Sequence, residues 1–209
     1  MPTTKEITVY KFSELSESVK KKVLDKYREH VEFFYDFVID DAEAILGMFG
    51  FSNVKIEFSG FWNQGDGACF TGVFNSEDFK FEKVVEYAPQ DKEIVRIAEG
   101  FKSVCSEYSS VKFSLYKISH HYSHHNTIGI TDVDFCDLKT GIGIGIDDFF
   151  NDKQVKDWKY LQKLSQDLMQ WVYKRLEEEY EYQTSDEQIL EQLNDGGQEY
   201  LEDGSAARF

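Results

Sequence analysis

The sequence predicts an α+β fold with a mainly antiparallel sheet, helices packed on one face of it, and a long C-terminal helix. Residues 54–58, 111–118 and 128–135 have the composition and alternation of strands. Residues 153–182 carry apolar side chains at every third and fourth position, which is typical of one long helix. These elements do not follow a regular strand–helix–strand order, and that irregular order favours an α+β fold.

Before the first of these strands, the sequence predicts a short strand over residues 7–12 and two helices. The first helix follows Ser16 as its N-cap. Its apolar stripe consists of Leu15, Val19, Val23, Tyr27 and Val31. The second helix covers residues 32–49, and Gly50 is its expected C-terminal stop. Its expected buried face consists of Phe34, Phe37, Val38, Ile45 and Met48.

The rest of the chain supplies further elements. Residues 70–74 read as a return strand, and Asp91 caps a helix after the break at Pro89. The buried side chains of that helix are Ile94, Ile97, Ala98, Phe101 and Val104. Residues 140–152 are expected to form a loop, and residues 184–187 match a capping box. We expect one domain over residues 1–209, in which residues 184–209 form an acidic appendage with a loose tail.

The composition limits the classes of function. The formal net charge is -16, which argues against direct binding to nucleic acid and to anionic membranes and favours a basic partner. Three scattered cysteines indicate free thiols in a reducing cytoplasm. We find no signal peptide pattern and no apolar run of membrane-spanning length. Neither a cofactor nor a metal is expected.

A glycine-rich stretch, residues 58–74, combines four glycines with large aromatic side chains. It lacks the Lys of a phosphate-binding loop, and Asp66 at its centre would repel a phosphate. A structural hairpin turn is therefore the simpler interpretation, with Trp62, Gln64 and Asp66 as candidate ligand or partner contacts. Cys69 follows the turn, and it would need a nearby histidine to act as a nucleophile. An inert small core residue is the simpler interpretation of Cys69.

A second cluster contains four histidines, His120, His121, His124 and His125. On a strand, equivalent histidines four residues apart are about 13 Å apart, which is too far for one metal ion. A polar strand or turn with hydrogen-bonded histidines is the simplest interpretation, and metal binding or ligand contact is the alternative. His120, Tyr122 and His124 are the candidate ligand or partner contacts here.

The end of the chain is acidic, because residues 176–203 contain no Lys or Arg. A solvated face is the simplest interpretation of these acids. A docking surface for a basic protein is the alternative. The carboxylates assigned to this surface are Glu177, Glu178, Glu179, Glu181, Asp186 and Glu187.

Four stretches resemble a family of small proteins of tailed bacteriophages and prophages with the signature FSGF-x-x-QGDGA. They are YKFSELSESVKKK, FSGFWNQGDGACFTG, ISHHYSHHNT and LEEEYEYQTSDEQILEQL. Residues 33–35 read FFY where many relatives carry a tryptophan pair, and Gln183 stands where Leu is frequent. Such proteins are often labelled antitoxins of toxin–antitoxin systems, and the resemblance implies no catalytic residues.

Two hypotheses follow. In the first, the chain is a non-enzymatic phage accessory protein that binds and inhibits or sequesters a host factor in the bacterial cytoplasm through its acidic surface. In the second, it is a nucleotide-binding sponge or hydrolase, with a pocket between the glycine turn and the histidine cluster. The first is favoured because the sequence contains no complete catalytic constellation.

Overall fold

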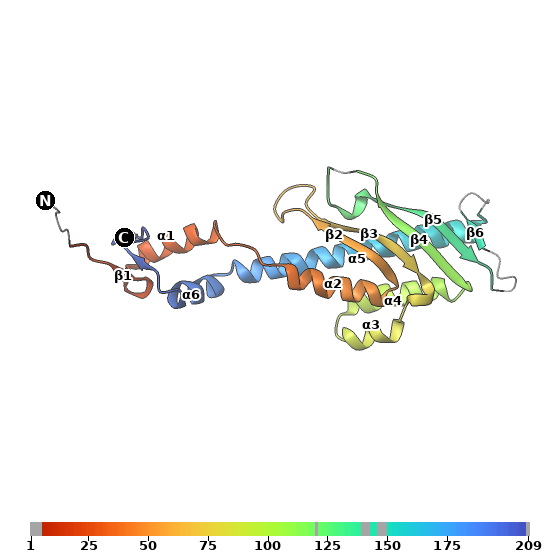
Figure 1. The fold of residues 1–209 in the computed structure, drawn as a ribbon, viewed down its shortest axis with the longest axis horizontal. Helices are drawn as coiled ribbons and strands as arrows, with labels where there is room; N and C mark the ends of the chain where they lie inside the picture. The colour runs from red at the N-terminus through yellow and green to blue at the C-terminus, as the bar shows by residue number, and fades with distance from the viewer. Residues whose placement is uncertain (1–5, 120, 139–142, 146–149, 208–209) are drawn as a thin grey trace. The chain divides into compact units, whose positions relative to one another are not determined.

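The computed structural model describes residues 6–119, 121–138, 143–145 and 150–207 (Figure 1). The chain divides into two compact units. The smaller unit consists of Met1–Phe34 with Glu178–Phe209, and the larger unit is Tyr35–Glu177. The long helix α5 (Asp152–Gln183) contributes to both. That the whole chain folds as a single domain stays a prediction.

The larger unit contains a five-stranded antiparallel sheet with the strand order β2-β3-β4-β5-β6. The strands are β2 (Phe51–Phe58), β3 (Ala68–Asn75), β4 (Ser110–Lys117), β5 (Ile128–Cys136) and β6 (Gly143–Gly145). The expectation of a loop is wrong at β6, because pairing with β5 turns these three residues into an edge strand. Residues 140–142 and 146–149 of the expected loop lie outside the described residues.

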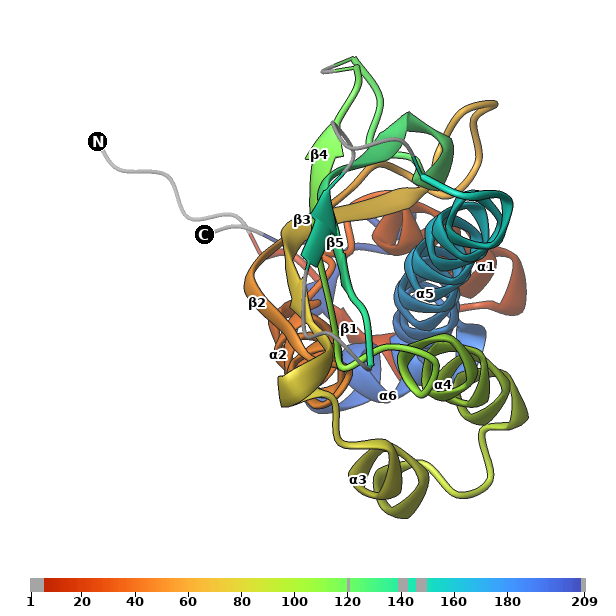
Figure 2. The same ribbon diagram turned by 90° about the vertical axis from the view of Figure 1, so that its right-hand side faces the viewer.

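Helices cover one face of this sheet. They are α2 (Asp36–Met48), α4 (Lys92–Cys105) and the first part of α5, while α3 (Phe81–Tyr87) packs on α2 and α4. Figure 2 shows α4 and α5 side by side against the sheet, and side chains from α2, α3, α4, α5 and the strands share one buried core. The predicted α+β class, with an antiparallel sheet and a long C-terminal helix, is confirmed.

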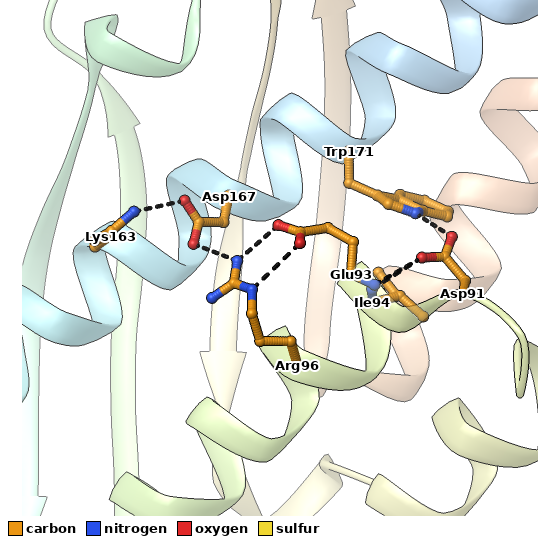
Figure 3. A network of polar contacts seen from close by, with 7 residues as sticks. All are labelled: Asp91, Glu93, Ile94, Arg96, Lys163, Asp167 and Trp171. Carbon is orange, nitrogen blue, oxygen red and sulfur yellow. Dashed lines mark hydrogen bonds and ion pairs between the residues drawn. The ribbon is translucent and has the colours of Figure 1, made fainter.

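The cap of α4 also joins this helix to α5 (Figure 3). One carboxylate oxygen of Asp91 accepts a hydrogen bond of 3.1 Å from the Ile94 N–H, and the other accepts one of 2.7 Å from Trp171 Nε1. An ion pair of 2.7 Å joins Arg96 to the nearly buried Asp167 of α5. The predicted cap is confirmed, and so is the buried face of α4, namely Ile94, Ile97, Ala98, Phe101 and Val104.

The predicted second helix is correct in its end and wrong in its start. Gly50 has a φ of +89°, as expected of a glycine that ends a helix. Because α2 begins at Asp36 and not at residue 32, Phe34 lies before it. The predicted burial of Phe34 and Phe37 is wrong, since they are 64% and 56% exposed. The buried face of α2 consists of Val38, Ala42, Ile45 and Leu46.

The smaller unit is built from both ends of the chain. Its elements are β1 (Tyr10–Lys11), α1 (Glu17–Arg28), α6 (Asp186–Asp195) and β7 (Glu199–Tyr200). Strands β1 and β7 pair antiparallel. A separate core forms between the two chain ends from Phe12, Leu15, Val23, Ile189, Leu193 and Tyr200. Helix α6 and strand β7 are thus packed against the N-terminal segment.

Local predictions for this unit are partly correct. Helix α1 follows Ser16 as predicted, but it ends at Arg28, so Val31 lies beyond the helix. The strand expected over residues 7–12 is limited to β1, and Tyr27 is 38% exposed although it was expected in the apolar stripe. Helix α6 has Ser185 as its N-cap. Among the described helices, none combines the length and apolar character needed to cross a membrane.

Candidate functional site

The glycine turn, residues 59–67, joins β2 to β3 and is closed by its own side chains. Asp66 Oδ2 accepts hydrogen bonds from the N–H groups of Trp62 (3.0 Å) and Asn63 (2.7 Å). The Ser59 N–H donates to the Gly67 carbonyl at 3.0 Å, and the Gly67 N–H donates to Ser59 Oγ at 3.1 Å. The carboxylate that we considered as a ligand contact therefore has a structural role in fixing the turn.

Aromatic rings anchor the same turn to α5. Phe61 stacks on Phe58 and on Tyr173, with centroid distances of 6.0 and 5.7 Å. The Tyr173 hydroxyl donates a hydrogen bond of 3.2 Å to the carbonyl of Gly60. These stacked rings and the hydrogen bond hold the turn against α5.

The histidine segment, residues 121–127, packs directly on the glycine turn. A Cβ atom on Gly67 would lie 2.7 Å from His124 Cδ2, and one on Gly65 would lie 3.6 Å from Tyr122 Cδ1. The glycine turn and the histidine segment, which are about 60 residues apart in the sequence, are therefore in contact in the structure. The sequence alone leaves this contact open. Only a residue without a side chain fits below the His124 ring.

The candidate contact residues differ in their accessibility. Trp62 and Tyr122 are 71% and 58% exposed, and Gln64 is exposed as well. His124 is half-buried, and its Nδ1 accepts a hydrogen bond of 3.1 Å from the Asn126 N–H. His120 lies outside the described residues.

The neighbouring His125 is held by the protein itself. Its Nε2 lies 2.9 Å from Gln170 Nε2, and its ring centroid lies 3.9 Å from that of His124. Burial, and then the charge of His124, lower the pKa of His125. Within the described part of the chain, no group of three or more His, Cys, Asp or Glu side chains has the geometry to hold a metal ion.

A charged network lies beside Cys69. The Glu57 carboxylate accepts a hydrogen bond from Lys117 and one of 2.6 Å from Lys55. These hydrogen bonds lower the pKa of Glu57 to about 2. Lys117 also donates to Ser123 Oγ at 3.4 Å. Cys69 is buried, and burial raises the pKa of its thiol. Because a thiol with a raised pKa stays protonated at neutral pH, Cys69 is a poor nucleophile.

The six predicted acids do not share one environment. Glu177 is half-buried in the larger unit, and the other five belong to the smaller unit. Glu179 accepts a hydrogen bond of 2.8 Å from Gln183, and Asp186 forms an ion pair with Arg28. The exposed members are Glu178, Glu181, Asp186 and Glu187.

Helix α6 carries a more continuous acidic surface than the sequence alone indicated. Glu187, Glu191 and Asp195 are exposed and recur every four residues, so they share one side of the helix. Ile189 and Leu193 are buried on the opposite side. We call the three carboxylates the acidic face. The signal in the sequence is their four-residue spacing, which becomes clear only when the buried side is known.

The smaller unit is also the more acidic one for its size. Its 66 residues contain 16 acidic and 8 basic residues, whereas the 143 residues of the larger unit contain 23 and 15. Both units thus have a net charge of -8, and the charge per residue is about twice as high in the smaller unit.

The fold and these sites define an α+β protein in which the glycine turn and the histidine segment form one packed corner. Residues 34–186 match the family described as Domain of unknown function (DUF8835), and the chain belongs to that family. No curated protein and no solved structure matches the chain significantly. The acidic face lies beyond the matched residues, while the packed corner lies within them.

Proposed function

We propose that the chain is a non-enzymatic accessory protein of a bacteriophage or prophage that acts in the cytoplasm of the bacterial host. In this proposal it binds a basic host protein and thereby inhibits or sequesters it. Both an antitoxin and an anti-defence protein would act in this way, and they would differ only in the host protein that they bind. The phage setting rests on the sequence resemblance. The single observation that supports binding to a basic partner best is the acidic face of α6.

The acidic face has the properties of a contact surface for a positively charged protein. Glu187 and Asp195 are eight residues apart, which is about 12 Å along a helix. Three carboxylates at this spacing repel one another, and a basic partner relieves that repulsion. Attraction between opposite surface charges also speeds encounter and makes binding sensitive to salt.

The test is capture of a host protein by a charge-matched set of variants. In the acidic-face variant, Glu187 and Glu191 become Gln and Asp195 becomes Asn. In the control variant, three exposed carboxylates of the larger unit, Glu86, Glu99 and Asp132, are changed in the same way. Both variants gain the same charge, so any difference between them reports the position of the acids.

Tagged protein would be incubated with bacterial lysate, and the captured proteins would be quantified by mass spectrometry. We expect one basic protein to be captured by the wild type and by the control variant, and to be lost from the acidic-face variant. Equal capture by all three proteins would contradict the proposal.

A nucleotide-binding function is the second candidate, and the exposed aromatic rings of the packed corner favour it. Trp62 and Tyr122 come from the two motifs that meet there, and such rings can stack on a base. This candidate predicts that nucleotides raise the melting temperature of the wild type. The double variant Trp62→Ala with Tyr122→Ala should lose that shift. No shift in the wild type would eliminate the candidate.

A further inference from the structure

A groove in the larger unit lies between the start of α2 and the second half of β2. It has a volume of about 680 Å³. It is lined by Tyr35, Asp36, Ile39 and Asp40, by Ile56, Glu57 and Phe58, and by Ser123. Figure 2 shows β2 at the margin of the sheet with α2 next to it, and the sheet order places β2 at the edge.

The backbone of β2 presents hydrogen-bonding groups toward this groove. The Ser59 N–H donates to the Gly67 carbonyl, so Glu57, two residues earlier, also directs its N–H and C=O toward β3. Backbone direction alternates along a strand, and Ile56 therefore directs its N–H and C=O away from β3. An edge strand with groups in this orientation can accept one more strand.

Negative charge forms one wall of the groove. Asp36 and Asp40 are exposed, and neither forms an ion pair or a side-chain hydrogen bond within the described residues. They are four residues apart, which is about 6 Å along a helix. Glu57 contributes less charge, because Lys55 and Lys117 neutralise it.

The spacing of the two carboxylates fits an extended basic segment. Side chains two residues apart on a strand point to the same side and are about 6.6 Å apart. Two lysines or arginines at alternate positions therefore match Asp36 and Asp40. Their aliphatic stems would cover Ile39 and Ile56, which line the groove and are half-buried.

We propose that this groove binds an extended segment of a partner protein with basic residues at alternate positions, which adds to β2 as a further strand. The site is separate from the acidic face and does not depend on the function proposed above. A second copy of the chain is a less suitable occupant, because it carries the same excess of negative charge, -16.

The test uses two fluorescein-labelled octapeptides of equal composition. One alternates lysine and threonine, and the other has the order KKTTKKTT, in which no two lysines are two residues apart. Fluorescence anisotropy would give the dissociation constant of each peptide. We expect the alternating peptide to bind about fivefold more tightly, because only its lysines match the spacing of the wall. Equal affinity of the two peptides would overturn the proposal.

Two variants locate the binding site. Asp36→Asn with Asp40→Asn should weaken binding of the alternating peptide about fivefold. The control is Glu86→Gln with Glu99→Gln, which should lose less than this. An equal loss in a control would show that only bulk charge matters and would overturn the proposal.

Ile56→Pro tests strand addition itself. Proline removes the N–H that points into the groove and leaves the bonds to β3 in place. It should abolish binding, whereas Ile56→Val should retain it. If Ile56→Pro does not fold by circular dichroism, the aspartate variant decides the outcome alone. A wild-type dimer in sedimentation that Ile56→Val retains and Ile56→Pro loses would assign the edge to a second copy and overturn the proposal.

Discussion

Replacing Gly67 by alanine tests the contact between the glycine turn and the histidine segment. The new Cβ would lie 2.7 Å from His124 Cδ2 and 3.3 Å from His124 Cα. Carbon atoms normally approach to about 3.5–4.0 Å, so the histidine segment must move by about 1 Å. Forced movement of this kind in a packed site costs about 1–3 kcal/mol. We expect the free energy of unfolding, measured in urea by circular dichroism, to fall by this amount.

A double-mutant cycle with His124→Ala assigns this cost to the ring. His124→Ala alone removes the hydrogen bond from the Asn126 N–H and the packing of the His124 ring on the glycine turn. In the double variant the ring no longer opposes the Cβ atom, so the two effects should be less than additive by about 1–2 kcal/mol.

The matched control is Gly47→Ala on α2. A Cβ there meets no atom within 4 Å, and alanine favours a helix, so stability should rise by about 0.5–1 kcal/mol. If Gly67→Ala and His124→Ala add within about 0.5 kcal/mol, the contact between the two motifs is refuted.

Three further changes test other parts of the fold. The pKa of Glu57 is lowered from 4.5 to about 2, so its bonds stabilise the protein above pH 4.5 and this stabilisation is lost as the pH falls toward 2. The stability difference between wild type and Lys117→Met should therefore shrink over that range in urea titrations. Asp91→Ala removes a cap and leaves the buried Trp171 N–H without its acceptor, which should cost about 2–4 kcal/mol in thermal or urea unfolding. Gly50→Ala places a side chain at a φ of +89° and against the backbone, and it should lower stability by more than about 1 kcal/mol.

Each change has its own control. Lys112→Met removes an exposed lysine with a long contact of 3.7 Å to Glu77, so its effect should not depend on pH in the same range. For the cap, Glu93→Ala removes only an exposed ion pair to Arg96, so a similar loss in both variants would contradict the role of Asp91. Gly47→Ala, which is expected to stabilise, is the control for Gly50.

The sequence predicted correctly those helices whose caps and apolar periodicity lie within the helix and the residues next to it. Asp91 is followed by apolar residues at helical spacing, and α4 begins there with its expected face buried. The apolar positions of α5 were equally clear, since its side chains repeat over many turns. Such elements can be predicted because the cap and the periodicity lie in neighbouring residues.

The predicted burial of side chains was wrong at the start of α2, where several aromatic residues allow the helix to begin at different positions. Phe34 and Phe37 extend the apolar pattern of α2 backwards, but the helix begins at Asp36 and its buried side is set by Ile45 and Leu46. The short strand β6 was missed for another reason. Its pairing with β5 is a tertiary contact, and three residues of glycine and isoleucine carry no strand signal alone.

The candidate site depends on long-range contacts in the same way. The sequence identified Trp62 and His124 as special, but only the fold brings the glycine turn and the histidine segment together. It also did not identify the groove, because Asp36 and Ile56 belong to different elements. The four-residue spacing of Glu187 and Glu191 was visible, and the burial of Ile189 shows which side is exposed.

The most direct test of the proposed function is the dissociation constant of the captured host protein, measured for three variants side by side. They are the acidic-face variant, its control at Glu86, Glu99 and Asp132, and the double variant of Trp62 and Tyr122. We predict that the acidic-face variant binds about tenfold more weakly, that the other two bind like the wild type, and that raising the salt concentration removes the difference. A loss of affinity confined to the variant of Trp62 and Tyr122 would contradict the account and move the working surface to the packed corner.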